Sequence, residues 1–209
     1  MQIDSNFEFP IKLVIIGDSG IGKTNFIFKF TENRFSPLHV ATVGFDYKSK
    51  IIKLPTSKKQ VKIQIWDTAG QERYTALNKN IFQQVQGIIL MYDITNRKSF
   101  DNVSKWLNLI YQTCGNKVKI LVGNKVDLSD ELRIVSEDEG KKLAEENNMD
   151  FFEGSGNSGT NVEEIFQSIA ESVYDNLLDG KESGYSSIQL SKKKMLKIKL
   201  KKKRNAVDI

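Results

Sequence analysis

The sequence predicts an α/β fold in which a mostly parallel sheet is covered by helices on both faces. Three observations carry this prediction. Short apolar runs, each the length of a buried strand, alternate with stretches of helical periodicity. Most of these runs end at polar turns, as strands do where the chain leaves a parallel sheet for a crossover helix. One pair of runs is joined by a short polar link instead, which indicates an antiparallel hairpin at a sheet edge.

The expected strands and helices follow in order along the chain. The parallel strands are expected at Ile11–Ile16, Val61–Trp66, Gly87–Tyr92 and Val118–Val122. The helices are expected from Lys23 to about Thr31 and at Ser99–Thr113, Ser136–Asn147 and Val162–Leu178. Ser136 and Glu139 have the spacing of a capping box, which predicts where their helix begins. The antiparallel edge is expected at Phe45–Leu54, joined to Val61 through Pro55–Gln60.

Composition excludes several classes of protein. The first ten residues include Asp4 and Glu8 and lack an apolar run, so we expect no signal peptide. No apolar stretch approaches the length of a membrane-spanning helix. The single cysteine, Cys114, excludes an internal disulfide and fits a reducing compartment. We therefore expect a cytoplasmic protein.

Charge is distributed unevenly along the 209 residues. Beyond Asp179 the sequence becomes rich in Gly, Ser and Lys and loses its periodicity, so we expect a domain at 1–178 and a flexible polybasic tail at 179–209. The net charge is +5, but nine basic residues at 192–204 contribute +9, which leaves −4 for the rest. These basic residues are Lys192, Lys193, Lys194, Lys197, Lys199, Lys201, Lys202, Lys203 and Arg204. Any anionic partner is therefore expected at the tail.

A glycine-rich loop follows the first expected strand and opens the first expected helix. The segment Gly17–Thr24 reads GDSGIGKT. Its glycines let backbone N–H groups approach phosphate oxygens, and the helix N-terminus adds the positive end of a dipole. Lys23 would reach the β- and γ-phosphates, and Thr24 would bind Mg²⁺. A plain glycine turn would not explain this Lys-Thr pair. The expected phosphate-site residues are Ser19, Gly20, Ile21, Gly22, Lys23, Thr24 and Asn25.

The choice of base is indicated by Asn124–Asp127, which reads NKVD and follows an expected strand. The Asp127 carboxylate can accept hydrogen bonds from both the N1–H and the exocyclic amine of guanine, a pair that adenine does not offer. The Asn124 amide can donate to N7. Alone, such a segment would suit a solvated turn. At a strand end downstream of a phosphate loop it indicates a guanine nucleotide.

A third segment, Asp67–Glu72 (DTAGQE), follows the expected strand Val61–Trp66. Asp67 is placed for a contact to Mg²⁺, direct or through water. Gly70 can offer its N–H to the γ-phosphate, and Gln71 can orient an attacking water. The alternative is an exposed acidic turn, which the other two segments make less favoured.

Together these motifs resemble the Ras superfamily, and Trp66–Tyr74 (WDTAGQERY) is similar to its Rab branch. The resemblance runs from about Phe9 to Leu178. It implies a single P-loop GTPase domain at 1–178 with a six-stranded sheet. It also implies that Thr42 closes on Mg²⁺ and the γ-phosphate and that Phe35 lies against guanine. The implied base-site residues are Asn124, Lys125, Asp127, Ser155, Gly156 and Asn157; the implied catalytic residues are Gln71, Lys23 and Thr42; the implied magnesium ligands are Thr24, Thr42 and Asp67.

The resemblance implies a function as well. Bound GTP would order two loops, 35–45 and 67–82, and effectors in vesicle trafficking would bind them, together with an exchange factor and a GTPase-activating protein. No arginine is placed to act in cis, so hydrolysis to GDP should be slow, on the order of 10⁻⁴ to 10⁻³ s⁻¹. The alternative is a module that holds nucleotide with little turnover. Nucleotide release by EDTA and a hydrolysis time course would distinguish the two.

Three features depart from the Rab pattern. Ser155–Asn157 reads Ser-Gly-Asn where the family usually has Ser-Ala-Lys, which predicts weaker nucleotide retention with guanine selectivity kept. Ile81 stands where an aromatic side chain is expected, so partner choice should differ. The sequence ends Arg204–Ile209 without the usual prenylated cysteines, so no prenyl anchor is expected.

The basic residues 192–204 offer another route to a membrane. They predict reversible contact with an anionic surface and hence a peripheral place on an intracellular membrane. A nuclear-import or RNA contact and a plain solvated tail stay open, and nucleic acid is the less favoured partner.

Overall fold

The structure is a computed structural model that describes residues 10–37, 45–68, 83–115, 117–128 and 130–182. Within these residues the sheet has six strands in the order β2-β3-β1-β4-β5-β6. The strands are β1 (Pro10–Ile16), β2 (Phe45–Lys53), β3 (Gln60–Thr68), β4 (Gly87–Asp93), β5 (Val118–Asn124) and β6 (Asp150–Gly154). Only β2 is antiparallel, pairing with β3 at the sheet edge, which confirms the expected fold class.

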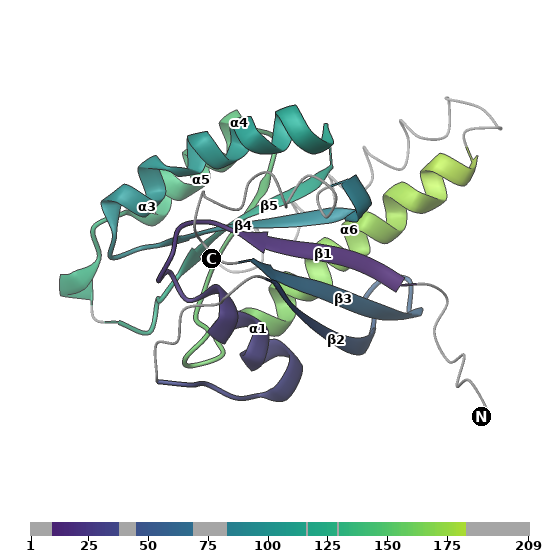
Figure 1. The fold of residues 1–209 in the computed structure, drawn as a ribbon, viewed down its shortest axis with the longest axis horizontal. Coiled ribbons are helices and arrows are strands. Elements are labelled where there is room, and N and C mark those ends of the chain that lie inside the picture. The colour runs from purple at the N-terminus through teal and green to yellow at the C-terminus, as the bar shows by residue number, and fades with distance from the viewer. Residues whose placement is uncertain (1–9, 38–44, 69–82, 116, 129, 183–209) are drawn as a thin grey trace, which may run out of the picture. The chain divides into compact units, whose positions relative to one another are not determined.

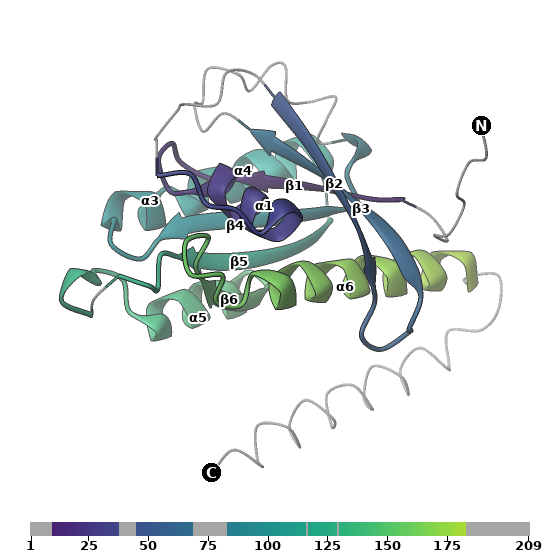
Figure 2. The ribbon, with the colours of Figure 1, turned by 90° about the horizontal axis from the view of Figure 1, so that it is seen from below.

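Helices cover both faces of the sheet (Figures 1 and 2). They are α1 (Lys23–Glu32), α3 (Arg97–Asp101), α4 (Val103–Cys114), α5 (Glu137–Glu146) and α6 (Val162–Glu182), with a 3₁₀ turn at Asp130–Leu132. The chain up to Val173, inside α6, forms one compact unit. In this unit α3, α4 and α5 lie on one face, and α1 and the first part of α6 lie on the other.

The two faces have separate apolar cores because successive strand residues point in opposite directions. Val14 and Leu90 pack with Leu107 and Ile110 of α4 on one face. On the other face α1 meets α6 through aromatic rings, and the Phe30 ring stacks on the Phe166 ring with centroids 3.9 Å apart. The strands between these layers carry almost continuous apolar residues, as the sequence predicted for a parallel sheet.

Local signals predicted some element ends correctly. The capping box at the start of α5 is confirmed, with Ser136 Oγ accepting from Glu139 N and the Glu139 carboxylate accepting from Ser136 N. The single helix expected at Ser99–Thr113 is wrong, because the helix is interrupted at Asn102 and the chain forms α3 and α4 instead. Strand β6 was not expected as an apolar run, because most of its residues are only half-buried.

Two other expectations have different outcomes. Within the described residues, none of the helices is both long enough and apolar enough to cross a bilayer. The domain boundary at 178 stays a prediction.

Candidate functional site

The segments singled out in the sequence meet at the carboxyl ends of the parallel strands. The strand pairings place Ile15 beside Asp67, Asp93 beside Asn124, and Asn124 beside Gly154. Strand β1 lies between β3 and β4. Later strands are therefore added on both sides of β1, and the strand order reverses at its carboxyl end. Open α/β sheets bind ligands at such a switch point, beyond the carboxyl ends of the strands.

Lys23, the first residue of α1, lies inside the glycine-rich loop. Its Nζ donates to the backbone carbonyls of Gly17 at 2.9 Å and Asp18 at 2.7 Å. Burial lowers its pKa to about 8, although the nearby Asp67 and Asp18 carboxylates raise it in part. Burial therefore disfavours the Lys23 ammonium more than the two carboxylates favour it. A bound polyphosphate would stabilise the charged form.

The loop's geometry depends on a glycine at the start of α1. Gly22 has φ +94°, in the region that L side chains rarely adopt. A Cβ at this position would also lie 2.7 Å from Asn124 Nδ2. Gly22 therefore allows both the turn into the helix and the approach of the Asn124 side chain.

An oxygen-rich pair lies beside Lys23. Thr24 Oγ1 donates to Asp67 Oδ2 at 2.7 Å, and Asp67 is buried at the end of β3. Among the described residues no group of three or more His, Cys, Asp or Glu side chains is placed to hold a metal ion. The hydroxyl and carboxylate oxygens nevertheless suit Mg²⁺, which prefers oxygen ligands and usually completes its shell with water and substrate phosphates.

Asn124 joins the phosphate loop to the segment after β6. Its buried side chain donates from Nδ2 to Ile21 O at 2.7 Å and accepts at Oδ1 from Gly156 N at 3.2 Å. The amide carries two N–H bonds, so one donor can still serve a ligand. A Cβ at Gly156 would lie 2.9 Å from Phe26 N, so the glycine found here in place of the family's alanine lets this segment approach α1 closely.

Asp127 is exposed, and both of its carboxylate oxygens accept hydrogen bonds from the segment after β6. Ser155 Oγ donates to Oδ1 at 2.5 Å, and Asn157 Nδ2 donates to Oδ2 at 2.7 Å. Burial by itself would raise the pKa of Asp127, but these two hydrogen bonds, together with a backbone hydrogen bond and the nearby Lys125 ammonium, lower the pKa below its ordinary value. The carboxylate is therefore ionised at neutral pH and held in a fixed orientation.

Two further side chains connect the site to its surroundings. Lys125, with φ +77°, places Nζ 2.6 Å from Asp93 Oδ2 and 3.3 Å from Gly20 O. Asn25 of α1 holds Ser36 by two hydrogen bonds, from Nδ2 to Ser36 O at 2.9 Å and from Ser36 N to Oδ1 at 3.0 Å. These contacts fix the chain directly after Phe35, whose side chain is exposed.

The structure brings together most of the predicted site residues. Ser19, Gly20 and Ile21 belong to the same loop as Lys23. Thr42, Gly70 and Gln71 lie outside the described residues. Sequence reasoning assigned no role to Asp93. It lies at the end of β4 as Asp67 lies near the end of β3, and that shared position was a signal that could have found it.

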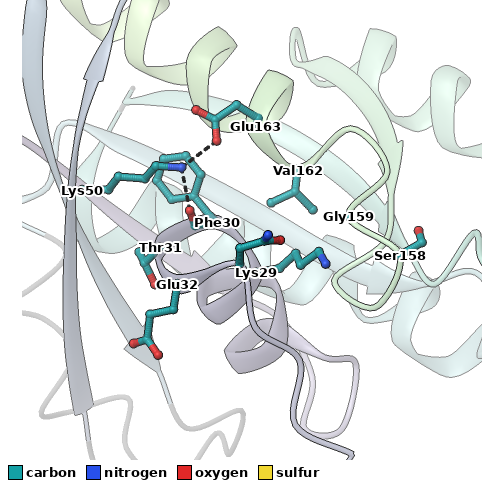
Figure 3. A pocket seen from close by; sticks show the side chains of 10 residues that line it. Lys29, Phe30, Thr31, Glu32, Lys50, Ser158, Gly159, Val162 and Glu163 are labelled. Carbon is teal, nitrogen blue, oxygen red and sulfur yellow. Dashed lines mark hydrogen bonds and ion pairs between the residues drawn. The ribbon is translucent and has the colours of Figure 1, made fainter.

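A separate polar groove lies between the end of α1, strand β2 and the start of α6, with a volume of about 570 Å³ (Figure 3). Lys50 Nζ lies in it, donating to Phe30 O and to the Glu163 carboxylate, both at 2.8 Å. None of the residues that line it is among the predicted site residues. Lys50 thus ties β2 to both helices.

Comparison with known proteins gives this geometry a family. The Ras family model matches residues 12–175. The chain belongs to the Ras family. It is 41% identical to the Ras-related protein Rab-3B of Mus musculus over 190 residues, 90% of this chain and 85% of the relative. It is 42% identical to the Ras-related protein Rab-3 of Caenorhabditis elegans over 179 residues, 85% of this chain and 80% of the relative.

A plant relative has a similar match. The chain is 45% identical to the Ras-related protein RGP2 of Oryza sativa subsp. japonica over 174 residues, 83% of this chain and 79% of the relative. The chain is therefore a Rab-like small GTPase of the Ras superfamily, an enzyme that hydrolyses GTP and acts in vesicle trafficking. Binding of GTP and GDP follows from the same membership.

Proposed function

We propose that the strand-end cluster described above is the site of GTP binding and hydrolysis, and that Mg²⁺ joins the nucleotide there. The observation that carries the proposal is the Asn124 side chain, which bonds the phosphate loop at Ile21 and the base segment at Gly156 at once. A ligand that contacted both segments would need a phosphate end and a base end, as a nucleotide has.

The base would be bound by the acceptor pair of Asp127 and by donors around it. The ionised carboxylate, oriented by Ser155 and Asn157, can accept from the N1–H and amine of guanine. Each carboxylate oxygen has two lone pairs, so the existing hydrogen bonds leave acceptor capacity for the base. The Gly156 N–H and the second Asn124 N–H would add donors, and Phe35 and Lys125 would flank the ring.

The phosphates would be bound at the start of α1. The Lys23 ammonium would exchange its backbone carbonyl partners for phosphate oxygens, forming stronger charge-assisted hydrogen bonds. Thr24 and Asp67 would hold Mg²⁺, which would neutralise charge developing on the transferred group. Ser19, Gly20, Gly22 and Asn25 complete this end of the site.

Hydrolysis and switching would use residues outside the described part of the chain. Gln71 would orient the attacking water, while Thr42 and Gly70 would sense the γ-phosphate, so that loss of phosphate changes the loops 35–45 and 67–82. Effectors, an exchange factor and an activating protein would bind these loops. The basic residues 192–204 would add a reversible contact with an anionic membrane, which places the protein on an intracellular membrane surface.

Base selectivity gives the most direct test of the residue assignments. Asp127→Asn replaces an acceptor pair by one acceptor and one donor, so GDP affinity should fall about a hundredfold or more. Xanthine carries a carbonyl where guanine carries the amine, so the xanthine nucleotide should bind the variant better than GDP does. Both affinities are measured with fluorescent nucleotide analogues.

Asp130→Asn is the matched control, because it removes the same charge from the adjoining 3₁₀ turn. It should leave both affinities unchanged. Unchanged preference for GDP in Asp127→Asn would remove Asp127 from the base site.

The proposed role of Gln71 has a separate test. Gln71→Leu removes the group that orients water and should lower single-turnover GTP hydrolysis at least about tenfold while GTP binding is retained. Hydrolysis at the wild-type rate would exclude Gln71 from the mechanism.

A further inference from the structure

Asp18 is the one charged side chain inside the phosphate loop whose role the proposed function leaves open. It lies between Gly17 and Ser19, and its backbone carbonyl accepts from Lys23 Nζ at 2.7 Å. Its side chain points away from this contact, toward α4. There Asn102 Nδ2 donates to Oδ2 at 2.7 Å and Trp106 Nε1 donates to Oδ1 at 2.8 Å.

Both donors are buried and committed to this contact. Asn102 is 7% exposed and Trp106 is 9% exposed. An indole has only one N–H, so Trp106 has no other hydrogen bond to give. Each oxygen of the carboxylate therefore has its own donor, and the two donors come from α4 and from the residue that precedes it, far away in sequence.

The Asn102 side chain bonds Asp18 instead of capping its own helix. It occupies the position before the first residue of α4, where an asparagine side chain normally caps the helix by accepting from a backbone N–H. No such side-chain cap is formed at α4. The amide donates to Asp18 instead, and the same residue marks the break between α3 and α4.

We infer that Asp18 is a positioning residue through which Asn102 and Trp106 of α4 hold the phosphate loop, and thereby set how slowly nucleotide leaves. The inference rests on the proposed function of the loop. Since the Asp18 backbone belongs to the loop and its side chain accepts from Asn102 and Trp106, a displacement of α4 would move the loop that binds the phosphates.

The test uses the full chain loaded with a fluorescent GDP analogue in Mg²⁺. Asp18→Asn keeps the size of the side chain but turns an NH₂ group toward a donor, so one hydrogen bond is lost and two donors oppose each other. Loss of a hydrogen bond to a charged group predicts GDP release about tenfold faster. Asp101→Asn is the matched control, because it removes the same charge at the neighbouring end of α3, and it should release GDP at the wild-type rate.

A second substitution separates positioning from simple loss of charge. In Asp18→Asn with Asn102→Asp, the new amide at position 18 can donate to the new carboxylate at position 102 and still accept from Trp106. The double variant should therefore release GDP at close to the wild-type rate. Release as fast as in Asp18→Asn alone would overturn the inference, as would a wild-type rate in Asp18→Asn.

Trp106 also supplies a spectroscopic readout that a merely structural contact would not give. Trp66 and Trp106 are the only tryptophans in the chain, so a Trp66→Phe protein reports Trp106 emission alone. Nucleotide release should shift this emission, and Asp18→Asn in the same background should abolish the shift. An unshifted emission in the Trp66→Phe protein would contradict the coupling. Failure of the wild-type chain to bind GDP would refute the proposed function instead.

Discussion

The two ends of the candidate site are built differently. At the base end, side chains hold one another: Asp127 accepts from Ser155 and Asn157, and Asn124 bonds two backbone segments. At the phosphate end, the Lys23 ammonium is held by carbonyls of its own loop, and burial lowers its pKa to about 8. The base end is thus oriented in advance, whereas the phosphate end carries a charge that an anion would stabilise. The preference for guanine should therefore depend on the base end, and the largest share of the affinity on the phosphate end.

The largest effect should come from the phosphate end. Lys23→Met keeps the length of the side chain but removes the ammonium, and the loss of its charge-assisted contacts should weaken GDP binding about a thousandfold. The free energy of unfolding of the nucleotide-free protein should change little, because burial disfavours the ammonium in the folded state. Equilibrium binding and denaturant unfolding measure the two quantities.

Lys29→Met, the same change on α1 outside the site, should leave GDP binding unchanged. Equal losses of GDP affinity in Lys23→Met and Lys29→Met would contradict a specific role of Lys23 in phosphate binding.

A smaller effect is expected at the base end. Asn157→Ala removes one of the donors that orient Asp127, so GDP should leave about five- to tenfold faster while the preference for guanine over adenine is kept. The measurement is GDP release together with competition by ADP. Ser158→Ala, in the same segment, is the control and should release GDP at the wild-type rate. A loss of guanine preference in Asn157→Ala would contradict the expectation that Asn157 orients Asp127 without setting the choice of base.

The smallest effect concerns stability away from both ends. Hydrogen bonds from Arg97 and from the Ser136 backbone and hydroxyl lower the pKa of Glu139 from 4.5 to about 2. A depressed carboxyl pKa stabilises the fold above pH 4.5, and this contribution is lost as the pH falls toward 2. Glu139→Gln should therefore melt slightly below the wild type at pH 6, and the gap should close near pH 2. A gap that persists at pH 2 would exclude this carboxylate as its source.

The sequence predicted features that depend on neighbouring residues. The Ser136 capping box, the glycine-rich loop before α1 and the apolar parallel strands are all local patterns, and the structure confirms each of them. Strand β6 was not predicted because most of its residues are only half-buried and form no apolar run.

Features that depend on distant partners could not be predicted in this way. Asn102, at the break between α3 and α4, donates to Asp18, which is 84 positions away. The resemblance predicted weaker nucleotide retention where Asn157 replaces the family's lysine. In the structure the Asn157 amide donates to the Asp127 carboxylate, 30 positions away. Whether retention is weaker in this chain stays a prediction.

The most direct measurement of the central claim is displacement of a fluorescent GDP analogue from the wild-type chain by GTP or ATP, with and without EDTA. The account predicts that excess GTP displaces the analogue and excess ATP does not, because guanine offers Asp127 an N1–H and an amine together and adenine does not. It also predicts that EDTA accelerates release, since Thr24 and Asp67 would no longer share Mg²⁺ with the phosphates. Displacement by ATP as readily as by GTP, or release indifferent to EDTA, would contradict the account.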